Sequence, residues 1–360
     1  MFVYNKDLRF NQFKETIHTM MKKIFLGAIL CASFGVMSCG NNAVNQPDVS
    51  DVQLPIKFEN LYKDMAAIDT NDIGNQLVAI SKKYPTFFDF YIDTLAGLGV
   101  YKEYTTATQN VRLFLTHKDY RALNDTVVAR FKDLKPTNDA ITKTLKLIKH
   151  YDAGFQLPTE VYYFVSGLNQ WNALTHFDTQ LGIGLDMFLG PDFGPYQSIG
   201  IPQYALIQFT DKSIPVWAAK AIYSNKYTFV SERGNTLLDM MLQRGKEQYF
   251  LSRVCPDVSP ALRLGFTEAQ FKWCEENQQM IYNFFVQGQY LYETNLQKVM
   301  RYVLDGPSAA GLPPESPANI GTYLGWKIVE AYAQQENKDI KGVLSSPNDV
   351  SILKAAKYKP

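Results

Sequence analysis

Apolar residues recur at intervals of three and four along most of the chain after residue 55, which is the spacing of one helix face. Pro85 and paired glycines interrupt the pattern, and helices are expected to end at such residues. The spacing predicts helices over residues 58–66, 74–84, 87–98, 110–115, 118–132, 138–150, 203–209, 215–224, 236–251, 267–292, 320–335 and 348–357. Thr267-Glu-Ala-Gln270 also has the sequence of a helix-capping box.

The pattern changes between residues 160 and 190. Glu160-Val-Tyr-Tyr-Phe-Val165 is β-branched and aromatic, which is typical of a strand, and residues 181–189 form a second apolar run before Gly190-Pro191. Residues 172–175 are a shorter segment, and residues 192–202 form a loop. A small sheet among helices predicts a mainly helical α+β protein. We expect one globular domain over 55–345, with a helical half (55–150) and a mixed half (151–345), then a C-terminal helix and tail (346–360).

The N-terminal region has the pattern of a lipoprotein signal. Met21-Lys-Lys23 precedes an apolar run of about 13 residues, which is shorter than the roughly 20 needed to span a bilayer. The run ends at Val36-Met-Ser-Cys39, which resembles a bacterial lipobox. We therefore expect a signal peptide over 21–38 and lipid on Cys39; a plain signal peptide with a chance cysteine is the alternative. Residues 1–20 are interpreted as an upstream start-site extension, and residues 39–54 as a polar tether.

Charge and hydropathy limit the partners of the mature chain. Removing residues 1–38 leaves 322 residues with 31 Lys and Arg against 33 Asp and Glu, a charge of −2. This balance argues against a nucleic-acid partner, because phosphate binding needs a basic surface. No later apolar stretch reaches membrane-spanning length, so membrane contact is expected through the lipid on Cys39. Position 41 is an asparagine, and no block of acidic residues follows Cys39. Both features favour an outer-membrane protein that faces the periplasm.

Two cysteines, Cys255 and Cys274, remain after the signal peptide and the lipidated residue. A disulfide is possible in an oxidising periplasm. Cys274 lies within a predicted helix, however, where a buried free thiol is a common core residue. Both alternatives stay open at this point.

The sequence carries no recognised catalytic or metal-binding motif. The mature histidines are His117, His150 and His176, with no HExxH, and the chain contains no G-x-S-x-G elbow, P-loop or CxxC. Gly182-Ile-Gly184 indicates close packing within a strand rather than a dinucleotide site. Asp186 interrupts an apolar strand and is either an outward-facing polar residue or an acid in a cleft. We expect no metal and no cofactor.

A set of short blocks, in this order, resembles the gliding-motility lipoprotein GldB family of Bacteroidetes. The blocks are Tyr162-Tyr-Phe-Val-Ser-Gly167, Leu181-Gly-Ile-Gly-Leu-Asp-Met-Phe-Leu-Gly190, Gly200-Ile-Pro-Gln-Tyr204, Gly245-Lys246 with Tyr249-Phe-Leu251, Pro256-Asp257, Gly265-Phe-Thr-Glu268, Trp273-Cys-Glu-Glu-Asn277 and Asn319-Ile-Gly-Thr-Tyr-Leu-Gly-Trp-Lys-Ile-Val329. The resemblance implies an envelope lipoprotein associated with gliding machinery and its linked secretion apparatus. Its partners would be envelope proteins of such a complex.

A more distant similarity, to predicted zinc peptidases, implies a protease-shaped scaffold with a cleft. The metal ligands are missing here, because residues 215–223 contain no histidine and Arg244 stands where a carboxylate ligand would be expected. The candidate cleft residues are Asp186, Tyr196, Arg244, Lys246 and Glu247. The lack of metal ligands favours a non-catalytic binding or assembly role. The alternatives are a periplasmic hydrolase with an unrecognised site and a small-molecule-binding lipoprotein that supplies a transporter.

Overall fold

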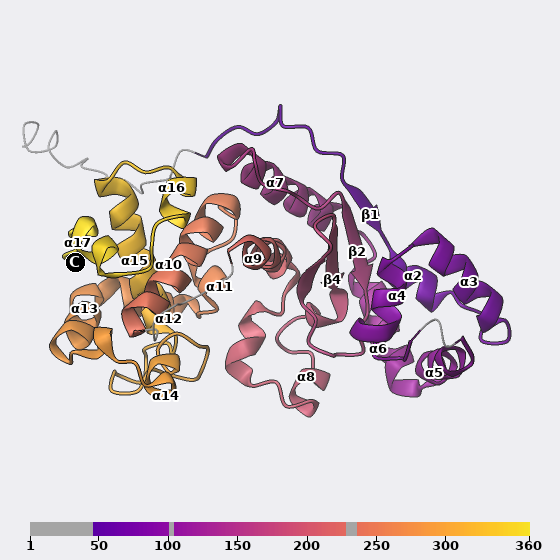
Figure 1. Ribbon diagram of the computed structural model, residues 1–360. Coiled ribbons are helices and arrows are strands. Elements are labelled where there is room, and N and C mark those ends of the chain that lie inside the picture. The colour runs from indigo at the N-terminus through magenta and orange to yellow at the C-terminus, as the bar shows by residue number, and fades with distance from the viewer. Residues whose placement is uncertain (1–45, 101–103, 228–235) are drawn as a thin grey trace, which may run out of the picture. The chain divides into compact units, whose positions relative to one another are not determined.

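The computed structural model describes residues 46–100, 104–227 and 236–360. Internal contacts divide the chain into residues 1–46 and residues 47–360, and all the described helices and strands belong to the second unit. The expected start-site extension, signal peptide and lipidated Cys39 lie outside the described residues. The expected mainly helical α+β class is confirmed by helices that surround one small sheet (Figure 1).

The helices of the first half are α2 (Leu61–Ala66), α3 (Ile73–Lys83), α4 (Phe87–Phe90), α5 (Tyr104–Thr116), α6 (Lys118–Arg130) and α7 (Lys135–Tyr151), with a π-helical turn at Tyr91–Leu95. Those of the second half are α8 (Pro195–Ser198), α9 (Ile214–Lys226), α10 (Leu237–Val254), α11 (Pro260–Leu264), α12 (Glu268–Glu276), α13 (Gln278–Gln287), α14 (Leu296–Met300), α15 (Ile320–Gln335), α16 (Ile340–Leu344) and α17 (Val350–Ala356). Short 3₁₀ turns occupy Leu185–Met187, Gln203–Gln208, Asp211–Ser213 and Tyr290–Tyr292.

The sheet has four strands in the order β1-β2-β4-β3. The strands β1 (Lys57–Glu59), β2 (Glu160–Phe164) and β4 (Gln180–Gly184) are parallel, and β3 (Ala173–His176) is antiparallel to β4. β1 comes from the helical half and pairs with β2 from the mixed half. The two halves that the sequence suggested therefore share one sheet.

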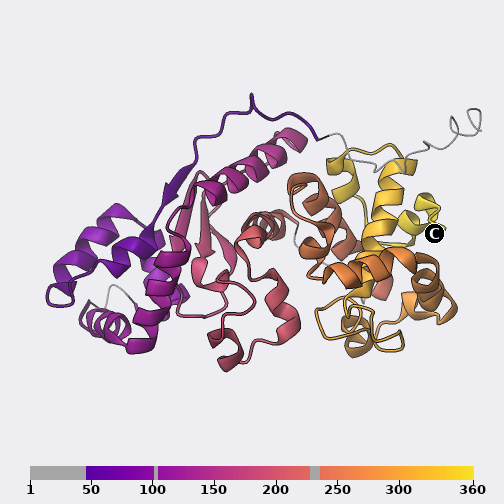
Figure 2. The same cartoon turned by 180° about the vertical axis from the view of Figure 1, so that it is seen from behind.

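Both faces of the central strands are covered, which explains why β2 and β4 are apolar throughout. Val161 and Ile183 belong to the core cluster that also includes α7 and α9, whereas Phe164 belongs to a second cluster with α2 to α5. Figures 1 and 2 show α7 and α9 on one side of the sheet and α2 and α4 on the other. Parallel strands are normally buried in this way. A Cβ on Gly184 would lie 2.0 Å from the Trp171 carbonyl oxygen, so the expected close packing at this glycine is present.

The C-terminal helices pack around the α10–α15 pair. A Cβ on Gly245 of α10 would lie 2.2 Å from the Gly325 carbonyl carbon, and a Cβ on Gly325 of α15 would lie 1.9 Å from the Met241 carbonyl oxygen. Glycine at both positions therefore allows the two helix backbones to approach closely. The expected C-terminal helix, α17, lies beside α15 (Figure 1).

Three long segments differ from expectation. The strand expected over 181–189 ends at Gly184, because the chain turns into a 3₁₀ helix that directs Asp186 into the core. The helix expected over 267–292 breaks at Asn277 between α12 and α13, although its Thr267 capping box is confirmed. The segment expected as a helix over 203–209 is a 3₁₀ turn.

The N-terminal boundary of the body also differs. The helix expected from Phe58 begins at Leu61, since residues 57–59 form β1. Residues 47–54, which belong to the expected tether, pack on the body: Val49 is buried, and Val52 is partly buried against the core. Figure 1 shows this segment running along α7 toward β1. Spaced apolar side chains anchor it, despite its polar composition.

Cys255 and Cys274 are both free and buried. The disulfide that the sequence left open is therefore not formed, and both thiols are core residues.

Candidate functional site

The loop that follows β2 is held by the carboxylate of Asp186. Asp186 Oδ2 accepts hydrogen bonds from the Ser166 main-chain N–H (3.0 Å), the Ser166 hydroxyl (2.9 Å) and the Leu168 N–H (2.8 Å). The loop follows the carboxyl end of β2, and Asp186 follows the carboxyl end of β4. In open sheets of parallel strands, ligands bind outside these ends. The Asp186 bonds therefore shape the part of the fold where a ligand is most expected.

The same loop contains strained backbone. Leu168 and Gln170, which follow Gly167, have φ angles of 64° and 61°. Residues with a Cβ rarely adopt this left-handed region, and such conformations persist only where surrounding interactions enforce them. The hydrogen bonds to the Asp186 carboxylate supply that restraint at Leu168. Backbone strain of this kind concentrates at ligand-binding sites.

Asp186 itself is fully buried. Its exposed fraction is 0%, and Oδ1 has no hydrogen-bond partner among the described residues. Burial raises the pKa of the Asp186 carboxyl above its ordinary value, although the three donors act in the opposite direction. Burial, together with the nearby charge of Asp186, also raises the pKa of the Tyr91 and Tyr120 hydroxyls. The acid therefore faces protein groups and not solvent.

The structure brings Tyr196, a second expected site residue, to Asp186. The Tyr196 hydroxyl donates to the Asp186 main-chain oxygen at 2.7 Å and accepts from the Leu189 N–H at 3.0 Å. Tyr196 is also fully buried. It therefore fixes α8 to the end of β4, and its hydroxyl is not directed at solvent.

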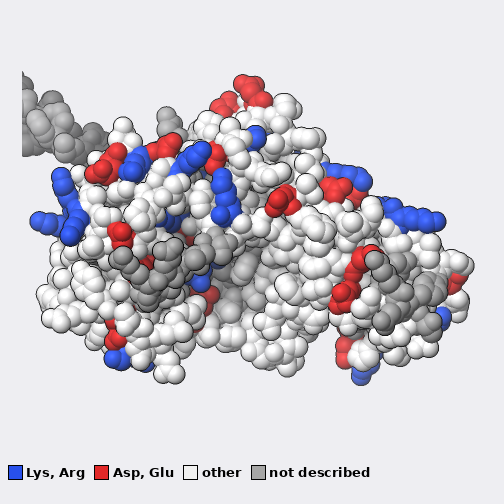
Figure 3. Space-filling model, viewed as in Figure 1, with Lys and Arg blue, Asp and Glu red and all other residues white. Residues whose placement is uncertain are grey.

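Two cavities, of about 820 Å³ and about 920 Å³, have a size that suits a small-molecule or side-chain ligand. The larger of the two lies beside this loop. This carboxyl-end cavity has a volume of about 920 Å³ and is lined by Gly97, Leu98, Asn110, Leu113, Phe114, His117, Asp119, Tyr120, Ala122, Leu123, Thr126, Gly167, Leu168, Phe193, Pro195, Ser198 and Ile199. Leu113 and Ile199 are 68% and 42% exposed. Figure 3 shows few charged side chains over α8. Exposed apolar side chains around an apolar cavity are typical of a binding surface.

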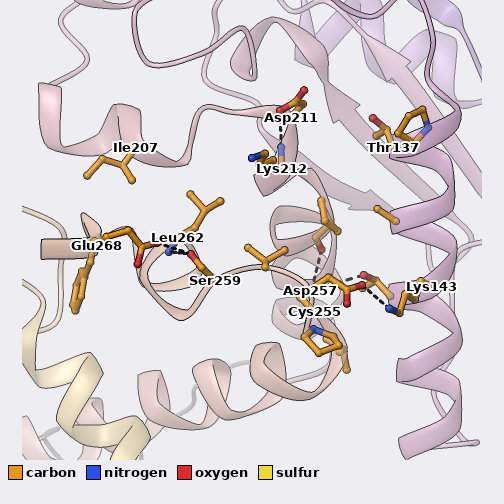
Figure 4. Close-up of a pocket in the computed structure, with 18 of the residues that line it drawn as sticks. Thr137, Lys143, Ile207, Asp211, Lys212, Cys255, Asp257, Ser259, Leu262 and Glu268 are labelled. Atoms are coloured by element: carbon orange, nitrogen blue, oxygen red, sulfur yellow. Dashed lines mark hydrogen bonds and ion pairs between the residues drawn. The ribbon is translucent and has the colours of Figure 1, made fainter. Parts of the chain in front are cut away.

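The second cavity, of about 820 Å³, lies between α7 and the α10–α12 segment (Figure 4). Its polar groups bond to one another: Lys143 pairs with Asp257 at 2.5 Å, and the Ser259 hydroxyl donates to Glu268 at 3.0 Å. Burial raises the pKa of the Cys255 thiol in its wall to about 12. The thiolate needed for nucleophilic chemistry is therefore not populated there at neutral pH.

The remaining expected site residues lie on α10 and make other contacts. Arg244 pairs with Glu247 at 3.3 Å on the same helix. Lys246 is 2% exposed and donates to the Ser346 main-chain oxygen, and burial lowers its pKa to about 8. Within the described part of the chain, no hydrogen bond or ion pair joins these residues to the loop after β2. The five residues expected in one cleft therefore occupy two separate places.

A family model described as gliding motility protein GldB matches residues 42–360. The chain belongs to the GldB family. Comparisons with curated proteins and with solved structures gave no match. The GldB match spans the whole described unit, so it includes the carboxyl-end cavity and α10 alike. The family resemblance is thus confirmed, whereas the similarity to zinc peptidases stays a prediction.

The described part of this GldB-family chain contains no group of three or more His, Cys, Asp or Glu placed to hold a metal ion. The described histidines make structural contacts: His117 caps α6 by accepting from the Asp119 N–H at 3.4 Å. His176 stacks on Phe90 at 4.1 Å between ring centroids, and His150 meets the Tyr151 ring edge-on at 5.2 Å. None of the described helices combines the length and the apolar character that crossing a bilayer requires.

Sequence reasoning missed the side chains that line the carboxyl-end cavity. Leu113 and Leu123 lie on helices whose apolar spacing resembles that of any core-facing helix. Ile199 lies in the Gly/Pro loop over 192–202, and an isolated apolar residue in such a loop was the one available signal. Only the packing of α5, α6 and α8 around the β2 loop brings the three together.

Proposed function

We propose that this GldB-family chain is a lipid-anchored component of the cell envelope that binds a protein partner without catalysis. The anchor would be lipid on Cys39, in the outer membrane with the body facing the periplasm. The partners would be envelope proteins of the gliding machinery or of its linked secretion apparatus. Family membership and the Val36-Met-Ser-Cys39 pattern support this role.

The carboxyl-end cavity is the observation that carries the binding role. It is the larger of the two main cavities, lies at the carboxyl ends of parallel strands, and has exposed Leu113 and Ile199 at its surface. Apolar area of this kind, once covered by a partner, contributes roughly 25 cal/mol for each Å² removed from water. We infer that an apolar part of the partner protein covers it.

The contacts of three of the candidate cleft residues also support binding. Asp186 and Tyr196 are buried and hold the loop after β2 and α8, and Lys246 holds the main chain before α17. Each of these groups already has a structural partner. A general acid or base must instead reach the proton that it transfers.

The test is a crosslinked pull-down from cell envelopes with the native chain, Leu113→Arg and Cys39→Ala. Leu113→Arg places a charge at the cavity without disturbing the core, because the side chain is 68% exposed. The matched control is Val128→Arg, on the adjacent α6, since Val128 is 36% exposed and does not line the cavity. We expect a fixed set of envelope proteins with the native chain and the control, and its loss with the other two variants.

Two results would overturn the proposal. The first is recovery of the same set with Leu113→Arg at equal protein level. The second is stoichiometric zinc binding together with peptide cleavage by the purified protein, which would favour a hydrolase.

A further inference from the structure

One edge of the sheet has unpaired main-chain groups. The Gly184 N–H donates to the Asn172 oxygen at 3.1 Å, which fixes the phase of the β3–β4 ladder. In an antiparallel pair, hydrogen-bonded and non-hydrogen-bonded residues alternate. Leu174 therefore bonds to β4, whereas the N–H and C=O of Ala173 and Thr175 point away from it. Among the described residues, no main-chain hydrogen bond reaches these four outward groups.

The two edges of the sheet are protected differently. The β1 edge is only three residues long and carries an ion pair between Lys57 and Glu59. Short strands and charged side chains are the usual means of preventing a further strand from adding. β3 has the sequence Ala-Leu-Thr-His, all four residues are half-buried, and Phe177 just beyond it is 67% exposed. β3 is therefore the edge that remains open to another strand.

A small pocket lies beside this edge. Its volume is about 260 Å³, and it is lined by Gly154, Phe155, Gln156, Pro158, Thr175, Asp178, Ile222, Asn225 and Lys226. We name it the Thr175 pocket. It lies between β3 and the C-terminal half of α9, on the side of the sheet that α9 covers. Its size suits one side chain and not a larger ligand.

The Thr175 pocket contains one unpaired charge. Lys226 pairs with Asp152 at 2.6 Å, so its charge is already matched. Asp178 accepts from the Asn225 amide at 3.0 Å and has no ion pair within residues 46–100, 104–227 and 236–360. The pocket therefore favours a cationic side chain.

We infer that β3 accepts an extended segment of another polypeptide as a fifth strand, with a Lys or Arg side chain in the Thr175 pocket beside Asp178. An extended backbone repeats its donors and acceptors every second residue, which matches the outward groups of Ala173 and Thr175. Main-chain bonds provide the affinity, and the pocket selects the side chain. The inference rests on the binding function proposed above but uses a different surface from the carboxyl-end cavity.

The experiment uses the full-length chain, purified in detergent, and a phage-displayed library of random linear nonapeptides. Selected peptides are synthesised with a fluorescent label, and their affinity is measured by polarisation. We expect them to alternate polar and apolar residues and to carry a central Lys or Arg.

Three variants locate the site. Thr175→Pro removes an outward N–H, and proline is tolerated on edge strands, so the fold should persist. It should weaken peptide binding about tenfold, the effect of losing one or two net hydrogen bonds. Thr175→Val keeps the main chain and should bind within about twofold of the native chain. Asp178→Lys should weaken basic peptides and leave the melting temperature unchanged.

Failure to select any peptide, or equal affinity for the native chain and Thr175→Pro, would overturn the inference. The two proposals fail separately. Peptide binding with no envelope partners in the pull-down counts against the proposed function, whereas a retained pull-down without peptide binding counts against the fifth strand.

Discussion

The Leu168 main-chain N–H donates to the Asp186 carboxylate at 2.8 Å, across 18 residues of sequence. The bond joins a residue in a left-handed conformation to an acid that is fully buried. Through it, the loop after β2 and the turn after β4 form one unit at the floor of the carboxyl-end cavity. The shape of the cavity therefore depends on a residue that does not line it.

Replacing Asp186 tests this dependence. Asp186→Ala leaves three donors without an acceptor and should lower the free energy of unfolding by about 3 kcal/mol or more. Asp186→Asn keeps one acceptor oxygen and removes the buried charge, so its effect should stay within about 1 kcal/mol. Urea unfolding of both variants measures the difference. Equal losses for the two variants would show that the charge, and not the acceptor, holds the loop.

The pH dependence of stability should report the same residue. The pKa of the Asp186 carboxyl is raised in the folded protein, so the folded state holds its proton to higher pH than the unfolded chain. Its contribution to stability is therefore full below the unfolded pKa of about 3.9 and is lost as the pH rises through the folded pKa. The stability of Asp186→Asn relative to the native chain should increase from pH 4 to pH 7. A constant difference would contradict the raised pKa.

Gly245→Ala tests the α10–α15 contact. In an exposed helix this change stabilises by up to about 1 kcal/mol. Here the new Cβ would lie 2.2 Å from the Gly325 carbonyl carbon, so the helices must separate and stability should fall by about 2–3 kcal/mol. Gly194→Ala is the control, because a Cβ there meets open space. Thermal unfolding should separate the two variants clearly, and an unchanged melting temperature for Gly245→Ala would argue against close packing.

Lys246 should make stability rise at alkaline pH. Burial lowers its pKa to about 8, so between about pH 8 and pH 10.5 the unfolded chain binds more protons than the folded chain. Stability from this group increases over that window, by up to about 3 kcal/mol. Tyr62 and Tyr84, with pKa values raised to about 12, act oppositely above pH 10. Subtracting the curve of Lys246→Met isolates the lysine, and identical curves would refute its shift.

Cys39→Ala should release a folded protein from the membrane and abolish its role, because the lipid is the expected membrane contact. Fractionation of envelopes and the melting temperature of the released protein measure the two parts. Full function from the released form would show that the body alone suffices.

Local sequence was sufficient for several features. Apolar spacing predicted most helices, because one helix face must be buried wherever it packs, and β-branched and aromatic residues predicted β2. The Thr267 capping box and the packing role of Gly182-Ile-Gly184 were also predictable, since each depends on neighbouring residues or on the lack of a side chain. The lipidation pattern ending at Cys39 is likewise local and stays a prediction.

Only tertiary structure decided the features that join distant segments. β1 is a three-residue strand whose partner lies about a hundred residues later, so no local pattern could reveal it. The same holds for the burial of Asp186, which depends on where the chain turns after Gly184 and on donors from the β2 loop. The carboxyl-end cavity and the open edge of β3 also form only when separate elements meet. Periodicity shows which residues are buried, but long-range contacts determine what they are buried against.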